Sequence, residues 1–427
     1  MSTSSTLWNG WQKISFRFLF LFLGLCSYLC WDDTIYLIHG TLYNTQLDIG
    51  ILYKPVVPAL SWLDTHIYHI GFNPETQATY PGDNHFGLVF YLTVFFISVI
   101  AAVVWGFLDK KRGNYDKLSY WFRLYLRYAL GIVIFGYGID KLIPVQMRYP
   151  SVMTMFTPYG HLDLFSVLWN SMGVAPGYMI FTGAAEVLAA FLLFSRRTAV
   201  AGYVLTAAVM ANVVALNIFY NITVKLFSTQ LLLFSLYLLA PYLKNIVRFF
   251  FYNDATPFSQ RRYTFYTGWK KYVLIAVLIV VPLAVLTINT VGVVNRYGHL
   301  KADIPKEKVY DVTTFIAKDT LPPLTTDTLR WKRFLLFNQW HADHAVVMSM
   351  NDEPDWYFYD VDTIKKTFTL YDNPAKKTLN ILHYISPSKD QLLLTGKWKG
   401  HDIQVALKLY PMDNMYLNKE KIKLVRD

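Results

Sequence analysis

The chain has 427 residues, of which 54% are hydrophobic and 17% aromatic, and it carries a formal net charge of +11. Only 16% of its residues are charged, against about 25% in soluble globular proteins, so the composition argues against an ordinary soluble protein. There are two cysteines, Cys26 and Cys30, and both precede the polar C-terminal part of the chain. That part therefore cannot be a disulfide-stapled domain.

The apolar residues collect into seven runs, each close to the 20 or so residues that a helix needs to cross a bilayer. The runs cover residues 15–31, 86–108, 120–143, 176–194, 199–220, 225–243 and 272–294. Lys13 and Arg17 precede the apolar core of the first run, as in a signal peptide, but bulky and acidic residues follow it where a cleavage site needs small ones. We therefore expect a retained span and a seven-helix transmembrane bundle.

Basic residues mark one side of this bundle, because short loops rich in lysine and arginine stay in the cytoplasm. They follow the second, fourth and sixth runs: Lys110, Lys111, Arg112, Lys117, Arg196, Arg197, Lys244, Arg248, Arg261, Arg262, Lys270 and Lys271. This pattern predicts a multi-pass protein of the bacterial inner membrane, with a cytoplasmic N-terminus, a periplasmic C-terminal domain and lipids as partners. The positive charge is thus topological and indicates no nucleic-acid partner.

After residue 297 the chain becomes polar and the apolar period falls towards two, which is typical of short strands. We expect strands at 309–316, 330–337, 345–350, 356–361, 367–371, 379–385, 391–398 and 403–409, with a hairpin turn at 399–402. Strands at such even spacing predict an all-β domain, either an up-and-down antiparallel barrel or a sandwich. The fold class is therefore mainly α membrane protein with a C-terminal β domain.

Polar side chains inside the apolar runs are the strongest functional signal, because a charge at the bilayer centre costs about 3 kcal/mol or more without a partner. At 1.5 Å per residue, Glu186 and Asn212 lie near the midplane, and Asp140 and Lys141 lie at the outer end of their run. Asn217 and Lys225 fall in the same outer half. This placement predicts a polar cavity that opens to the periplasm.

Within that cavity we expect Glu186 to exchange protons and Lys141 to bind an anionic or quinone oxygen. The remaining lining residues are expected to contact a ligand: Tyr137, Asp140, Asn212, Asn217 and Lys225. Structural roles stand beside these: Lys141 and Lys225 can reach the interface, the asparagines can join helices, and Glu186 can form an ion pair. Arg127 is assigned a structural role, and the residues indicate no metal site.

Short motifs in residues 120–245 resemble those of the DoxX-like membrane proteins, including members from the Bacteroidota. They are Leu126-Arg127, the segment Gly136–Leu142, Gly183-Ala184-Ala185-Glu186 and Arg196-Arg197-Thr198-Ala199. The resemblance maps Arg127, Gly138, Lys141, Glu186 and Arg197 onto the family pattern. It implies a four-helix core and a redox-linked or quinone-adjacent protein, and quinone is the cofactor class that it suggests.

The chain thus divides into two N-terminal helices with a long external loop (1–119), a DoxX-like core (120–245), a connection with the seventh helix (246–296) and a β domain (297–427). The first functional hypothesis is a redox-linked membrane protein. The second is a membrane anchor that presents the β domain to a protein, lipid or small ligand. The third is a membrane enzyme of carboxylase-like or lipid-modifying type. A redox role for Cys26 and Cys30 stays open, although buried cysteines are mostly small hydrophobes.

Overall fold

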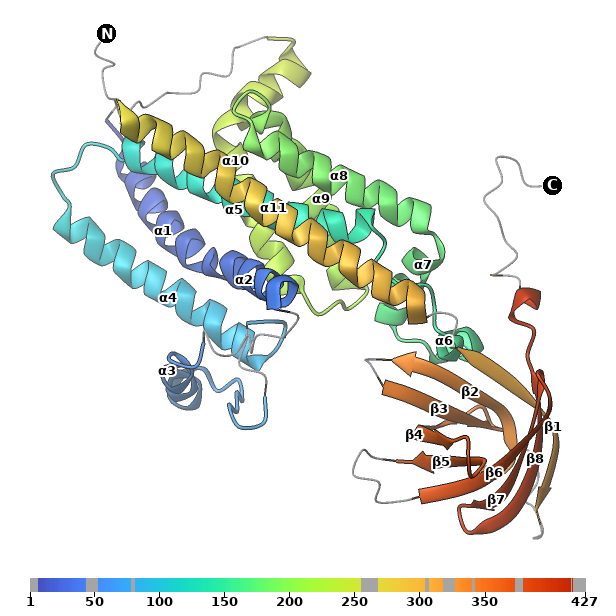
Figure 1. Cartoon of the computed structure of the whole chain (residues 1–427). Coiled ribbons are helices and arrows are strands. Elements are labelled where there is room, and N and C mark those ends of the chain that lie inside the picture. Colours follow the sequence, from blue (N-terminus) through green and yellow to red (C-terminus); the bar gives the residue numbers. More distant parts are fainter. Residues whose placement is uncertain are drawn as a thin grey trace. The chain divides into compact units, whose positions relative to one another are not determined.

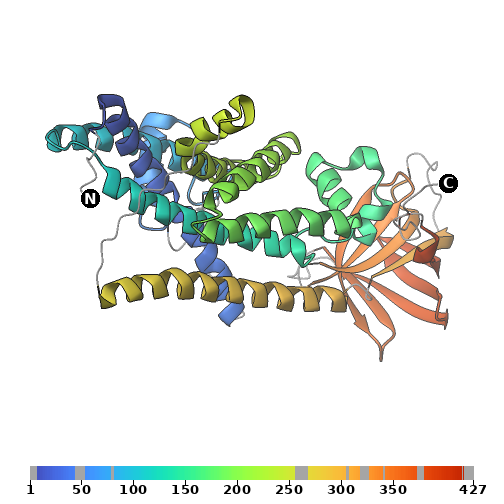
Figure 2. The same ribbon diagram turned by 90° about the horizontal axis from the view of Figure 1, so that it is seen from above.

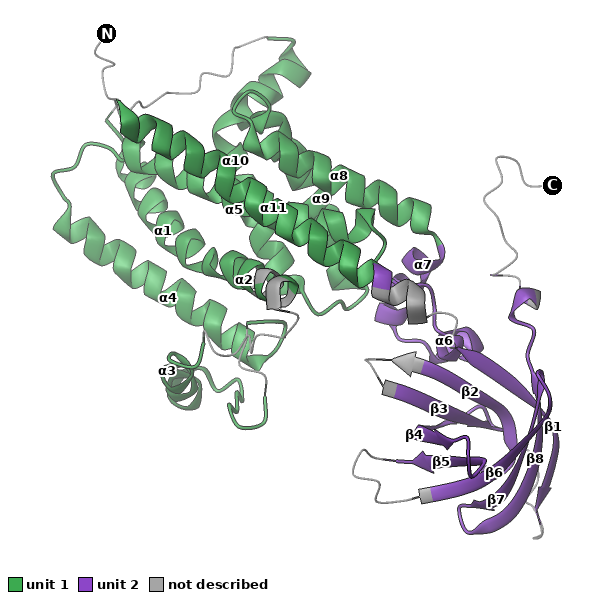
Figure 3. Ribbon diagram, viewed as in Figure 1, with its two compact units in different colours: residues 1–147, 175–297 green, residues 148–174, 298–427 purple. Residues whose placement is uncertain are grey.

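The computed structural model describes residues 7–43, 53–77, 81–254, 268–303, 307–317, 327–339, 342–372, 379–415 and 417. The chain forms two compact units (Figure 3). Unit 1 comprises residues 1–147 and 175–297, and unit 2 comprises residues 148–174 and 298–427. The second unit therefore takes in a segment that lies between two transmembrane runs of the first.

The regular secondary structure in the described part of unit 1 is helical (Figure 1). Seven of its helical stretches are long and apolar enough to cross a membrane, which confirms the seven predicted runs. The helices are α1 Gly10–Cys26, α2 Tyr28–Tyr43, α3 Val57–Leu63, α4 His85–Leu108, α5 Asp116–Leu142, α8 Pro176–Phe194, α9 Ala199–Phe219, α10 Lys225–Tyr252 and α11 Trp269–Asp303. The first span is α1 together with the start of α2.

The connection after the first span begins later than expected, because the chain stays helical to Tyr43 instead of ending its helix near residue 31. The helix bends at Ser27, whose hydroxyl donates to the carbonyl of Gly24 at 2.6 Å. Asp32 then lies buried and accepts a hydrogen bond from the Tyr53 hydroxyl at 3.1 Å. Because the Tyr53 hydroxyl donates a hydrogen bond to this carboxylate, the acidic side chain can be buried within a helix.

Helices α5 and α8 cross at two glycines. A Cβ on Gly183 would lie 2.5 Å from the backbone nitrogen of Leu142 and 2.7 Å from the carbonyl oxygen of Gly138. A Cβ on Gly138 would lie 2.9 Å from the backbone nitrogen of Val187. Small residues at a crossing let two membrane helices approach closely. The two backbones are therefore in van der Waals contact beside Lys141 and Glu186.

We predict that Gly183→Ala destabilises the protein by about 1–3 kcal/mol, the usual cost of overpacking a tight site. The added methyl group would meet backbone atoms of α5, which cannot rotate out of its way. Thermal unfolding in detergent micelles measures the effect. Gly136→Ala on α5 is the matched control, because its Cβ would be 3.7 Å from the Asn289 side chain, an ordinary contact. Equal melting temperatures for the two variants would contradict this account of the crossing.

Helix α11 runs along α5 (Figures 1 and 2). Asn289 of α11 lies beside Gly136, and Arg296 Nη2 donates to Asp140 Oδ1 at 2.6 Å. Both contacts join segments more than 150 residues apart in the sequence. They attach the seventh span to the third.

Unit 2 contains a closed barrel of eight antiparallel strands in sequence order, which decides between the two predicted β architectures. The strands are β1 Lys308–Ala317, β2 Trp331–Gln339, β3 Ala342–Ser349, β4 Pro354–Asp362, β5 Thr367–Tyr371, β6 Leu379–Ser388, β7 Gln391–Trp398 and β8 His401–Leu409. Pairing of Tyr310 with Leu409 joins β1 to β8 and closes the sheet. Closure removes the exposed edges that would otherwise invite pairing with other chains.

The barrel interior is packed with large apolar side chains rather than hollow. Trp331, which begins β2, and Trp398, which ends β7, belong to this core with ring centroids 4.9 Å apart, and both are at most 2% exposed. The hairpin predicted between β7 and β8 is present: Lys399 and Gly400 both have positive φ, of 48° and 87°. Two such residues form the turn whose twist matches that of paired strands.

Residues 148–174 contain α6 Val152–Phe156 and α7 Leu164–Val174. Val152 packs on the outer wall of the barrel against Leu335 and Val346. Its backbone N–H donates to Glu307 at 3.3 Å. Burial raises the pKa of Glu307, and the hydrogen bond from Val152 lowers it in part. The loop between α5 and α8 is thus built into the β unit.

Candidate functional site

Lys141 and Glu186 meet at the crossing of α5 and α8. The Lys141 ammonium lies 2.8 Å from both carboxylate oxygens of Glu186. The two side chains are only 10% and 4% exposed. The Tyr137 ring lies one turn away on α5, with its centroid 5.8 Å from the ammonium. The structure therefore places these three predicted residues next to one another.

Their geometry is that of a closed ion pair. A buried charge is tolerated when an opposite charge and hydrogen bonds compensate it, and here each partner satisfies the other. Glu186 therefore lies against a single cation. Separation of the carboxylate and the ammonium would free the two N–H donors that Glu186 now occupies for a ligand oxygen.

Asp140 does not face this pair. Its carboxylate binds Arg296 of α11 at 2.6 Å, and the arginine side chain is 51% exposed. Asp140 and Lys141 are neighbours in sequence, and successive helical residues point about 100° apart. Asp140 and Lys141 at the end of α5 therefore form ion pairs with two different helices, α11 and α8.

The three remaining predicted residues lie away from the pair. The Asn217 side-chain amide donates to the Ser228 hydroxyl at 2.9 Å and so joins α9 to α10. Lys225 binds Asn221 at 2.9 Å and lies 3.5 Å from Asp83. Asn212 is exposed on the surface of α9 and does not join Glu186. Of the seven predicted site residues, the structure brings together only Tyr137, Lys141 and Glu186.

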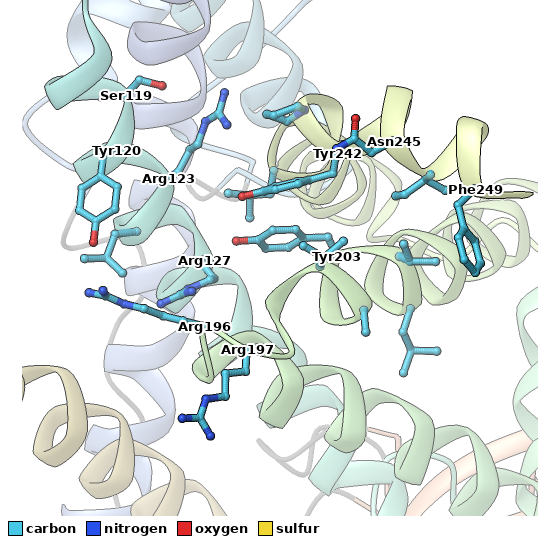
Figure 4. Close-up of a pocket in the computed structure, with 18 of the residues that line it drawn as sticks. Ser119, Tyr120, Arg123, Arg127, Arg196, Arg197, Tyr203, Tyr242, Asn245 and Phe249 are labelled. Atoms are coloured by element: carbon cyan, nitrogen blue, oxygen red, sulfur yellow. The ribbon is translucent and has the colours of Figure 1, made fainter. Parts of the chain in front are cut away.

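A cavity of about 1380 Å³ lies elsewhere, among α5, α9 and α10 (Figure 4). It is near the opposite end of α5, next to the turn that joins α8 to α9. Its polar lining is mostly cationic or phenolic: Asp116, Ser119, Tyr120, Arg123, Arg127, Arg196, Arg197, Tyr203, Tyr242 and Asn245. Its apolar lining includes Val204, Leu205, Leu238, Ile246, Phe249 and Phe250. This cavity was not predicted from the sequence.

Arg127 is the most deeply buried arginine of the cavity, at 5% exposure. Its guanidinium carbon lies 5.3 Å from the centroid of the Tyr128 ring, and the Tyr203 hydroxyl faces it (Figure 4). Its Nε has no hydrogen-bond acceptor among the described residues. Sequence reasoning gave Arg127 a structural role. The overlooked signal in the sequence is that Arg123 and Arg127 are one helical turn apart on α5, at the same end of the bundle as the basic turn Arg196-Arg197.

The two cysteines are buried and form no disulfide with each other. The Gln230 side-chain amide lies 3.7 Å from Cys30 Sγ, and the Tyr91 hydroxyl donates to Gln230 at 2.8 Å. Cys26 and Cys30 are one turn apart on either side of the Ser27 bend. Their thiols lie in the packed interior of the helices rather than at an accessible surface.

The fold defines a multi-pass membrane protein that carries a C-terminal closed eight-stranded β-barrel. The chain is 32% identical over 118 residues to the uncharacterized protein YwoB of Bacillus subtilis (strain 168). The match covers 28% of this chain and 72% of that protein. The chain thus belongs to the same family as this protein, whose name states no activity. No family model and no solved structure matches the chain.

Proposed function

We propose that this is a redox-linked, quinone-adjacent protein of the bacterial inner membrane, with a DoxX-like core formed by α5, α8, α9 and α10. The observation that supports it is the convergence of the motif residues. Lys141 and Glu186, from separate helices, are bound to each other at 2.8 Å, and Gly138 packs against Val187 beside them. The N-terminus would be cytoplasmic and the barrel periplasmic, as the basic loops indicate.

The ion pair suggests how such a site would work. Both carboxylate oxygens of Glu186 accept hydrogen bonds from the Lys141 ammonium, so two of its three N–H donors are used in this state. A proton on Glu186 removes its negative charge and weakens the pair. Lys141 can then donate to another oxygen, with the Tyr137 ring alongside.

A quinone fits this arrangement only in the opened state, where one of its oxygens would accept from Lys141. A bound quinone would supply the two-electron redox chemistry. The chain's own contribution is to hold the proton at Glu186, to place the Lys141 donor and to keep water out of the crossing. The buried side chains of the pair supply that exclusion.

The test uses the full-length protein in nanodiscs and a short-chain menaquinone analogue as the probe. We expect the wild type to bind the quinone and the double variant Lys141→Met/Glu186→Leu to bind it at least about tenfold more weakly, the cost of one charge-assisted hydrogen bond. The double variant is chosen because removal of both charges preserves a packed crossing. Asn212→Ala, on the exposed face of α9, is the matched control.

Two results would contradict the proposal. One is a wild-type protein that binds no quinone. The other is a folded double variant that binds quinone as well as the wild type, which would leave the ion pair a structural element of the helix crossing.

A second candidate function is a membrane anchor that presents the barrel to a protein partner. The cluster of large apolar side chains inside the barrel favours it over binding of a small ligand there, because such side chains occupy the space that a ligand would need. The outer wall instead exposes Trp356 at 47% and Ile381 at 49%. A photo-crosslinker at position 356, with exposed Ile364 as the control position, should yield a defined adduct in cells; equal labelling from both positions would count against it.

A further inference from the structure

We propose that the cavity among α5, α9 and α10 binds an amphiphile with an anionic, phosphate-like head group. This inference does not depend on the proposed redox function. Along α5, Arg127 and Lys141 are 14 residues apart, which is about 21 Å at 1.5 Å per residue. The cavity, at Arg127, and the ion pair, at Lys141, are thus two separate sites along α5.

The charge of the cavity indicates the head group. Four arginines line it, and Asp116 is the one acidic residue among its lining residues. Asp116 already accepts a hydrogen bond from the Trp8 indole at 2.8 Å. Within the described residues no carboxylate lies within ion-pair distance of Arg123 or Arg127. An excess of cationic side chains in an apolar bundle favours the binding of an anion.

The buried donors indicate where the anion would bind. The Nε atoms of Arg123 and Arg127 are buried without an acceptor among the described residues. An unsatisfied buried donor costs about 1–3 kcal/mol, and Arg127 is the more buried of the two. The planar guanidinium offers parallel donors that match the oxygens of a phosphate. Arg127 is therefore the anchor that we assign to the head group.

Two tyrosines complete the polar side. The rings of Tyr203 and Tyr242 stack with centroids 6.0 Å apart, and their hydroxyls point towards the arginines (Figure 4). Arg196 and Arg197, from the turn between α8 and α9, line the same side. Phenol hydroxyls can donate to the phosphate oxygens that the arginines leave free.

The apolar lining distinguishes an amphiphile from a soluble anion. Leu205, Leu238 and Phe249 line the cavity together with the arginines, and Phe249 is 54% exposed. These residues belong to two candidate membrane spans, α9 and α10. A ligand with an acyl or isoprenoid chain would cover them, whereas a free anion would leave them bare. The volume exceeds the roughly 300–1,000 Å³ of ordinary small-ligand pockets.

The experiment reconstitutes the full-length protein in nanodiscs of phosphatidylcholine with one fifth phosphatidylglycerol and counts retained lipids by native mass spectrometry. We expect the wild type to retain phosphatidylglycerol selectively. Arg127→Gln should lower this retention about tenfold, the loss of one charge-assisted contact. Arg248→Gln is the matched control, because Arg248 lies on α10, is 46% exposed and does not line the cavity. It should retain lipid as the wild type does.

Two further arms decide the source of the anion and guard against misfolding. Ala208→Phe keeps every arginine but fills the apolar side of the cavity, and it should also lower retention. Glycerol phosphate, which has the head group without the chain, should compete only at far higher concentration. Retention by Arg127→Gln equal to that of the wild type would overturn the site. Competition by glycerol phosphate as strong as by the lipid would overturn the amphiphile assignment.

Discussion

Removing either charge of the Lys141–Glu186 pair is expected to destabilise the protein by about 3–5 kcal/mol, whereas removing both is expected to cost little. Glu186→Gln leaves the Lys141 ammonium buried with only a neutral partner, and Lys141→Met leaves the carboxylate of Glu186 unpaired. Both side chains are at most 10% exposed, so water cannot replace the lost partner. In Lys141→Met/Glu186→Leu no charge remains to be compensated.

Thermal unfolding of the four proteins in one detergent measures this non-additivity as a double-mutant cycle. Asp140→Asn is the control, because its partner Arg296 is half exposed and exposed pairs contribute about 0–1 kcal/mol. Single variants as stable as Asp140→Asn would show that water enters the crossing. A double variant as unstable as the singles would show that the packing, not the charge, stabilises the crossing.

Trp398→Ala is expected to destabilise the barrel by about 3–5 kcal/mol, the usual cost of truncating a buried aromatic residue. Trp398 is fully buried. Its ring lies 4.9 Å from that of Trp331 and 5.1 Å from that of Tyr357, centroid to centroid. Removal of the indole leaves a cavity that side chains on several strands border, and a closed sheet cannot collapse readily to fill it.

Trp356→Ala is the matched control on the neighbouring outer wall, where the side chain is 47% exposed, and we expect less than about 1 kcal/mol. Limited proteolysis of the full-length protein measures the difference as faster cleavage within residues 307–415. Cleavage of Trp398→Ala at the rate of Trp356→Ala would contradict a packed interior. Accelerated cleavage within α5–α10 as well would show that the two units unfold together.

The proposed redox function and the proposed amphiphile site involve different residues of α5. The DoxX-like pattern includes Arg127 as well as Lys141 and Glu186, and the structure places Arg127 in the cavity and the other two at the crossing. A lipid or similar amphiphile held at Arg127 would leave the ion pair unchanged. The quinone and lipid experiments can therefore fail independently.

The depth of each polar residue could be estimated from the sequence, but its direction could not. Asn212 and Asn217 lie five residues apart on α9, which turns them about 140° from each other. Asn217 is buried against Ser228, and Asn212 is exposed. Depth alone had placed both in one cavity. The rotation of each helix about its axis depends on packing against helices that are distant in the sequence. It therefore cannot be predicted from the sequence of that helix alone.

The seven spans and the eight strands could be predicted from the amino-acid sequence alone, because hydrophobic length and apolar period are local properties. It left barrel and sandwich open, since closure depends on pairing β1 with β8, about 100 residues apart. Three features could be seen only in the folded chain. Lys141 pairs with Glu186, Asp140 pairs with Arg296, and four arginines line one cavity. Each of these arises where helices from separate parts of the chain meet.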